Sequence, residues 1–125
     1  MINAAMKDWD FVEEMATRRV DQAQRLHKAI ADNGLPIISP AAGDCVLFDV
    51  SDYMDVEQYK NPATSFVTKI YAETGIRGGS HVSGMEKENC KIYYVRFAIT
   101  LCMPDEKIDA LIAPLIIVLK SITAV

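Results

Sequence analysis

The segment Lys91–Thr100 (KIYYVRFAIT) places the strongest constraint on the fold of this 125-residue chain. Successive side chains of a β-strand point to opposite faces of the sheet, so residues two apart share a face. The alternation puts Tyr93, Val95, Phe97 and Ile99 on one face, and Ile92, Tyr94, Arg96 and Ala98 on the other. The fully apolar face needs an apolar layer packed against it. The segment is therefore predicted to be the central strand of a sheet covered on one side.

Apolar residues at steps of three and four predict three helices. The first spans roughly Asp8 to Asn33. The second starts at Asn61-Pro62, a helix cap followed by a favoured first helical residue, and ends at Gly75. Its buried face is expected to consist of Phe66, Val67, Ile70 and Tyr71. The third is capped by Asp105. Its apolar stripe consists of Ile108, Leu111, Ile112, Leu115, Leu119 and Ile122.

Short apolar runs at Ile37-Ile38 and Cys45–Phe48 predict two further strands, and Ser51–Lys60 is expected to be a polar connection. The glycine-rich stretch Ile76–Gly84 is expected to be a short strand that enters a loop. Strands interleaved with helices in so short a chain indicate a single α+β domain, residues 1–125. It should have two layers, a small, mainly antiparallel sheet and about three helices.

Composition excludes several classes of function. Thirteen basic against seventeen acidic residues give a net charge of −4, which speaks against nucleic-acid binding. The uncharged run Ala110–Leu119 has ten residues, about half of the ~20 that a membrane span requires. The N-terminal residues lack the apolar core of a signal peptide, and the three cysteines are sparse. Reduced thiols in a cytoplasmic protein are therefore expected.

The chain contains none of the common catalytic or phosphate-binding motifs. His27 and His81 are far apart and predict no metal site. Cys45 and Cys102 are in apolar surroundings and are expected to behave as small hydrophobes, and Cys90 is expected to be an exposed thiol without an adjacent base. No catalytic residue is predicted.

Arg96 is a charge in the middle of the apolar, aromatic strand. It is either an arginine whose stem covers the open face of a sheet, or a guanidinium held rigidly for bidentate capture of a carboxylate. Spacing alone favours the first interpretation.

Five motifs stand in the order known from one enzyme family: Arg19-Val20 with Gln22, Gly34–Ile38 with Pro40, Gly43 with Val46–Asp49, Pro62-Ala63 with Ile70-Tyr71 and Gly75–Arg77, and Val95–Ile99. With these motifs, roughly residues 11–125 resemble the C-terminal small domain of the pyridoxal-phosphate-dependent β-eliminating lyases. This is the tryptophanase and tyrosine phenol-lyase group, which has the aspartate-aminotransferase-like fold.

The resemblance implies that Arg96 binds the α-carboxylate of an amino-acid substrate and that Arg77 is an accessory arginine near the domain junction. Three features depart from the family. Its glutamate shortly after the motif at Gly75–Arg77 has no counterpart before Gly79-Ser80, and two motifs differ. Ala42-Gly43-Asp44 stands where the family has Gly-Gly-His, and Ile99-Thr100-Leu101 where it has Ile-Pro-Arg. The family's Schiff-base lysine and phosphate-binding loop belong to its large domain, which the resemblance does not cover. The chain is thus expected to be a stand-alone or truncated small domain that is inactive alone and binds no cofactor of its own.

Two alternatives remain open. The chain is a module that binds carboxylates or amino acids, or the small subunit of a split enzyme that docks onto a separate cofactor-binding large domain. A homodimer through the C-terminal helix is also expected, because Ala113, Ile116 and Ile117 point away from its apolar stripe.

Overall fold

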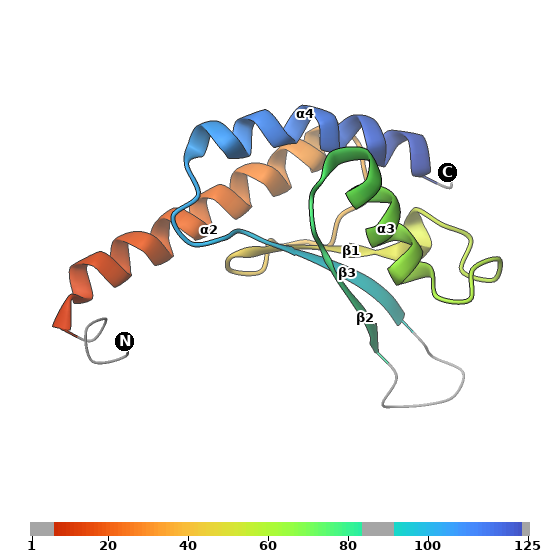
Figure 1. The fold of residues 1–125 in the computed structure, drawn as a ribbon, viewed down its shortest axis with the longest axis horizontal. Coiled ribbons are helices and arrows are strands. Elements are labelled where there is room, and N and C mark those ends of the chain that lie inside the picture. Colours follow the sequence, from red (N-terminus) through yellow and green to blue (C-terminus); the bar gives the residue numbers. More distant parts are fainter. Residues whose placement is uncertain (1–6, 84–91, 124–125) are drawn as a thin grey trace.

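In the part of the chain that the structure describes, an antiparallel sheet of three strands and a cover of three helices form two layers (Figure 1). The computed structural model describes residues 7–83 and 92–123. The elements in chain order are α2 (Trp9–Asp32), β1 (Cys45–Asp49), the 3-10 helix η1 (Val50–Asp52), α3 (Pro62–Thr74), β2 (Gly79–Ser83), β3 (Ile92–Ala98) and α4 (Asp105–Ile122). The predicted two-layer α+β class is confirmed.

The sheet has the order β1-β3-β2, so the segment predicted to be the central strand is central. Val95 and Phe97 are buried beneath the helices, whereas Arg96 and Ala98 are exposed on the other side. Leu47 of β1 and Gly79 of β2 lie directly opposite Arg96 on its two flanks. Lys91, where the predicted strand began, is outside the described residues.

Side-chain caps fix the starts of two helices. The Asp8 carboxylate accepts a hydrogen bond from the amide of Phe11 at 3.2 Å, and the Asn61 amide oxygen accepts one from the amide of Thr64 at 3.1 Å. α3 ends at Gly75, whose φ of 74° is left-handed and favours glycine. The first turns of α2 extend beyond the sheet (Figure 1), and the first buried residue of the helix is Met15.

Aromatic side chains form the centre of the core. Phe48 is fully buried, and its ring centroid lies 5.6 Å from Tyr53, 5.8 Å from Phe66 and 5.5 Å from Phe97. The Tyr53 hydroxyl donates a hydrogen bond to the carbonyl of Pro36. Tyr53 lies within the segment expected to be a polar connection, so that expectation is wrong at this position. Burial raises the pKa of Tyr53.

Two local predictions, one before β1 and one in α3, are wrong. Ile37-Ile38 is not a strand, because only the amide of Ile38 bonds to β1, at 2.9 Å to the carbonyl of Leu47. Pro40 follows and has no amide hydrogen to continue a ladder. Tyr71 of α3, expected to be buried, is 53% exposed because the helix packs through Ala63, Phe66 and Ile70.

The start of α4 also differs from expectation. Asp105 is the first residue of the helix and not its cap, which is Pro104 with no side-chain cap bond. The Asp105 carboxylate instead accepts a hydrogen bond from Nε2 of Gln22 at 2.7 Å. The tertiary contact with α2 therefore replaces the local cap.

α4 packs against both α2 and α3 and buries a wider face than its stripe predicted. Ile116 is buried within the chain, so the expectation that it points outward is wrong, whereas Ile117 is 69% exposed. The homodimer through this helix stays a prediction. Among the described residues, no helix combines the length and apolarity that a membrane span needs.

Candidate functional site

The side of the sheet away from the helices carries polar and aromatic side chains, and we call it the open face. It is formed by alternate residues of the three strands, which include Leu47, His81, Tyr94, Arg96 and Ala98. Arg96 lies in the middle of this face on the central strand. A central strand is a rigid support, because both of its edges are hydrogen-bonded.

Arg96 is exposed, and no residue in the described ranges forms an ion pair or a side-chain hydrogen bond with it. A guanidinium presents its donors in a planar fork that matches a carboxylate. The sequence placed Arg96 on this face. Only the structure shows that its guanidinium is left without an internal carboxylate partner among the described residues.

His81 and Tyr94 are directly opposite each other on β2 and β3, and their rings stack. The ring centroids are 5.2 Å apart with an interplanar angle of 17°. Nε2 of His81 leans toward Gly79, where it would lie 3.3 Å from an added Cβ atom. This nitrogen is buried and has no hydrogen-bond partner among the described residues. The sequence placed His81 in a glycine-rich loop. The cross-strand register, which sequence reasoning missed, brings it beside Arg96.

Arg19 of α2 and Asp44, which directly precedes β1, form an ion pair. Arg19 also donates to the carbonyl of Ile99, from Nε at 3.0 Å and from Nη2 at 2.8 Å, and so fixes α2 to the end of β3. The hydrogen bond from the Cys45 thiol, together with the charges of Arg19 and Arg96, holds the pKa of Asp44 below its usual value, although burial opposes this. Asp44 therefore presents a carboxylate near Arg96.

The described cysteines and His27 lie in surroundings that indicate structural roles. Burial, followed by the hydrogen bond to Asp44, raises the pKa of the Cys45 thiol, which makes it a poor nucleophile. Cys102 is exposed at a turn with a φ of 60°, and its sulfur lies 3.7 Å from the sulfur of Met15. His27 bonds through Nε2 to the carbonyl of Ile38 at 3.1 Å. Cys90 lies outside the described residues.

Arg77, the second arginine implied by the resemblance, is exposed just before β2. It lines a cavity together with core residues such as Phe97 and Ile99, on the helix side of the sheet. Arg96 is exposed on the opposite side of β3 from the buried Phe97. The structure therefore does not bring the two arginines together into one site.

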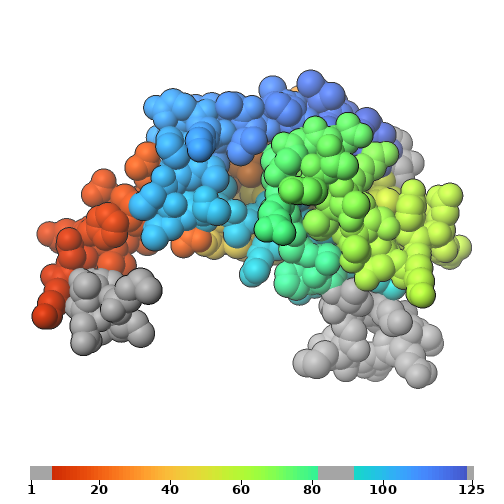
Figure 2. Space-filling view, in the orientation of Figure 1, coloured from red at the N-terminus to blue at the C-terminus, as the bar shows by residue number. Residues whose placement is uncertain are grey.

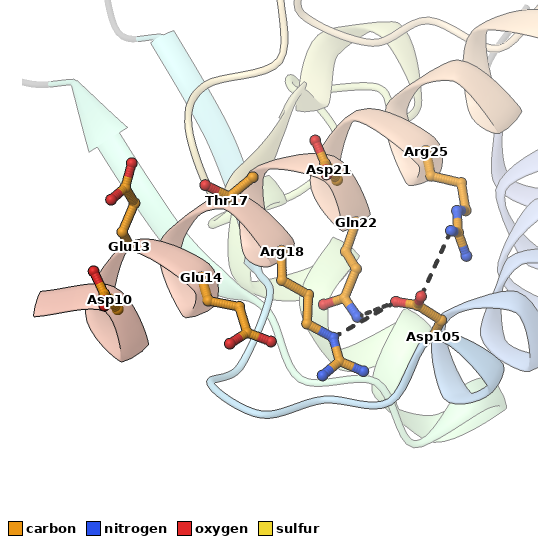
Figure 3. Close-up of a pocket in the computed structure, with 9 residues that line it drawn as sticks. All are labelled: Asp10, Glu13, Glu14, Thr17, Arg18, Asp21, Gln22, Arg25 and Asp105. Atoms are coloured by element: carbon orange, nitrogen blue, oxygen red, sulfur yellow. Dashed lines mark hydrogen bonds and ion pairs between the residues drawn. The ribbon is translucent and has the colours of Figure 1, made fainter. Parts of the chain in front are cut away.

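A second polar region is the hollow between α2 and the start of α4 (Figure 3). In Figure 3, Arg18, Gln22 and Arg25 converge on Asp105. The Gln22 amide is buried and also donates to the carbonyl of Met103 at 2.7 Å. This network fastens two helices together. Within residues 7–83 and 92–123, no cluster of three histidine, cysteine or acidic side chains could hold a metal ion.

The described lysines all lie in exposed positions. Lys28, Lys69, Lys107 and Lys120 are on the helices, which cover the opposite face of the sheet from Arg96. Lys28 and Lys120 are bonded to Asp32 and Asn33, respectively. None of these lysines is beside the open face.

The sequence is similar to parts of curated proteins named as tryptophanases and a tyrosine phenol-lyase. A probable tryptophanase of Aeropyrum pernix is 28% identical over 88 residues, which are 68% of this chain and 19% of the relative. A probable tryptophanase of Halobacterium salinarum is 39% identical over 62 residues, 47% of this chain and 13% of the relative. A tyrosine phenol-lyase of Nostoc punctiforme is 31% identical over 80 residues, 61% of this chain and 17% of the relative.

The predicted relationship to the tryptophanase and tyrosine phenol-lyase group is thus confirmed for part of the chain. The matched region spans less than a fifth of the length of each of these curated relatives. No protein-family model matches the chain.

Proposed function

We propose that this chain is the small domain of a tryptophanase-like, pyridoxal-phosphate-dependent lyase and that Arg96 binds the substrate carboxylate. The observation that carries the proposal is the exposed Arg96 on the open face, without a carboxylate partner in the described part of the chain. The relationship to tryptophanases supports the amino acid as the source of that carboxylate. In this proposal the chain supplies substrate binding and orientation, and another domain supplies the cofactor.

The described residues do not fit pyridoxal phosphate itself. The cofactor needs a lysine that forms its covalent anchor and groups that tune its ring. The described lysines are exposed, and those on the helices lie across the sheet from Arg96. We therefore derive no catalytic step from this chain and propose that it is inactive alone.

One observation favours the alternative of an amino-acid-binding module. The Asp44 carboxylate is close enough to Arg96 for the guanidinium charge to lower the pKa of Asp44. Cys45 and Ala98, directly opposite each other, provide a floor of small side chains at this end of the face. A zwitterionic amino acid has a carboxylate for Arg96 and an ammonium group for Asp44. In such a module the chain would bind amino acids without a partner domain.

The first prediction concerns Arg96. Titration of the isolated chain with an amino acid should shift the arginine side-chain signals of Arg96 in NMR spectra. Arg96→Gln should weaken binding at least about tenfold, and Arg96→Lys should weaken it less, because lysine keeps the charge but loses the bidentate fork.

Arg25→Gln is the matched control, since Arg25 is an exposed arginine on α2 away from the open face. Equal affinity in the wild type and Arg96→Gln would contradict the role of Arg96. Weakened binding of alanine but not of propionate in Asp44→Asn would favour the module.

The second prediction concerns catalysis. Purified chain mixed with pyridoxal phosphate should develop no specific internal-aldimine absorbance, and it should release no pyruvate from tryptophan, tyrosine or cysteine. Turnover that is lost when one particular lysine is replaced would contradict this. Co-expression with a cofactor-bearing large domain should restore activity if the chain is part of a lyase, and Arg96→Gln should abolish that restored activity.

A further inference from the structure

A cavity of about 310 Å³ opens on the helix side of the sheet, at the end of β3. In Figure 2 a hollow lies between the blue start of α4 and the green segment at the end of α3. Its deep walls are core side chains: Leu26, Phe97, Ile99, Ile108 and Leu115. A close-packed interior rarely leaves a space larger than a water molecule. A cavity of this size, open to the surface, therefore has the dimensions of a ligand site.

The path of the chain after α3 creates the opening. β2 pairs with β3 only from Gly79, opposite Arg96, onward. No backbone hydrogen bond in the described ranges joins residues 76–78 to residues 97–99. Gly78 rests on the ring of Phe97, where an added Cβ atom would approach to 2.7 Å. The connection therefore touches the Phe97 side chain but forms no backbone hydrogen bond to the end of β3, and the cavity opens between the two segments.

The chemistry of the cavity is apolar with one cation at its edge. Arg77 is exposed, lines the cavity and forms no ion pair or side-chain hydrogen bond within the described residues. Two threonines also line the cavity. The Thr74 hydroxyl is already engaged, because it donates to the carbonyl of Ile70 and accepts from the amide of Ile76, and Thr100 is exposed. A ligand with an apolar body and an anionic head is complementary to this arrangement.

We propose that the cavity binds a small carboxylate amphiphile, with a short fatty acid as the simplest example. The alkyl chain lies against Phe97, Ile99 and Leu115, and the carboxylate pairs with Arg77. The site is separate from Arg96, which is on the opposite side of β3 from Phe97, and it does not depend on the proposed lyase function.

A series of acids tests the apolar half of the proposal. Binding of pentanoate, hexanoate, heptanoate and octanoate is measured by NMR titration below micellar concentrations, with the methyl signals of Ile99, Leu111 and Leu115 followed. Affinity should rise by up to about fourfold for each added methylene, the factor expected from its burial. Absence of saturable shifts at these methyl groups overturns the proposal.

The charged head is tested with matched ligands and variants. 1-Octanol and octylamine should bind at least about tenfold more weakly than octanoate, and Arg77→Gln should reduce octanoate affinity by about the same factor. Lys69→Gln, which removes an exposed charge from α3, should have no effect. Octanol binding as tight as octanoate overturns the assignment of the ligand class.

Occlusion provides the last control. Leu111→Trp should fill the cavity and abolish octanoate binding, whereas Ile117→Trp places the same side chain on the exposed side of α4 and should leave it unchanged. Circular dichroism checks that both variants fold. If the wild type sediments as a dimer that Leu111→Trp dissociates, the cavity holds a second copy of the chain and the proposal is overturned.

Discussion

Phe48→Ala is expected to lower the free energy of unfolding by about 4 kcal/mol, the range found for large aromatic truncations in a closed core. Phe48 is fully buried and touches three other aromatic rings, those of Tyr53, Phe66 and Phe97. Its replacement by alanine removes buried apolar surface and leaves a cavity between β1, β3 and α3. The hydrogen-bonded strands cannot move in to fill this cavity. A domain of this size has a total stability of roughly 5–15 kcal/mol, so the loss is a large fraction. Urea unfolding monitored by circular dichroism measures it.

Tyr71→Ala is the matched control for this prediction. Tyr71 is an aromatic residue of α3 that is 53% exposed, so its truncation should change the free energy of unfolding by less than about 1 kcal/mol. If Phe48→Ala does not fold, Phe48→Leu should still unfold cooperatively at a lower urea concentration. Equal midpoints for Phe48→Leu and the wild type would contradict the assigned position of Phe48 in the core.

Gln22→Glu should lower the free energy of unfolding by about 3 kcal/mol at pH 7, because it introduces a buried charge. Gln22 is 2% exposed, and its Nε2 donates at 2.7 Å both to the carbonyl of Met103 and to Asp105. A carboxylate at this position has no hydrogen to donate, so it would face the Met103 carbonyl and the Asp105 carboxylate as two unpaired acceptors. Arg18 and Arg25 lie near Asp105 (Figure 3) and offset only part of the cost.

The effect of Gln22→Glu should depend on pH with a definite sign. Burial and the charge of Asp105 raise the pKa of the new carboxyl in the folded state above its unfolded value of about 4.3. Ionisation of the new carboxyl therefore costs the variant no stability below that value. As the pH rises through the pKa of the folded state, the free energy of unfolding of the variant falls relative to that of the wild type. The difference from the wild type should be small near pH 4 and large at pH 7.

Gln24→Glu is the control for the charge change itself. Gln24 is an exposed residue of the same helix, two positions away. This substitution should change the free energy of unfolding by no more than about 0.5 kcal/mol at either pH. Gln22→Glu as stable as Gln24→Glu at pH 7 would show that the contact between α2 and α4 is not fixed by the Gln22 amide.

Sequence patterns predicted the structure correctly where residues that are neighbours in sequence determine it. The helix predicted for Asp8 to Asn33 is found at Trp9–Asp32, with Asp8 as its cap. Asn61, Pro62 and Gly75 delimit α3 as predicted, because capping bonds and the left-handed φ of Gly75 involve neighbours in sequence. The alternation around Arg96 fixed which residues of β3 face the helices, since side-chain direction follows from strand geometry alone.

Predictions failed where a distant segment competes with a local signal. Asp105 has the composition of a helix cap, yet Gln22 on α2 binds its carboxylate. Tyr53 follows polar residues and is nevertheless buried against Phe48 and Phe66. Ile116 is buried because α4 is covered on two sides, which a single helical stripe does not reveal.

The sequence by itself determined the two-layer class, the central strand and the position of Arg96, because these follow from periodicity and from the order of motifs. The tertiary structure decided what surrounds Arg96. The register of β2 against β3 brought His81 and Tyr94 together beside it, and the turn before β1 brought Asp44 to the same face. It also separated Arg77 from Arg96 and placed Arg77 at an apolar cavity. Register and the path of connections depend on contacts between residues far apart in sequence, and local patterns do not specify such contacts.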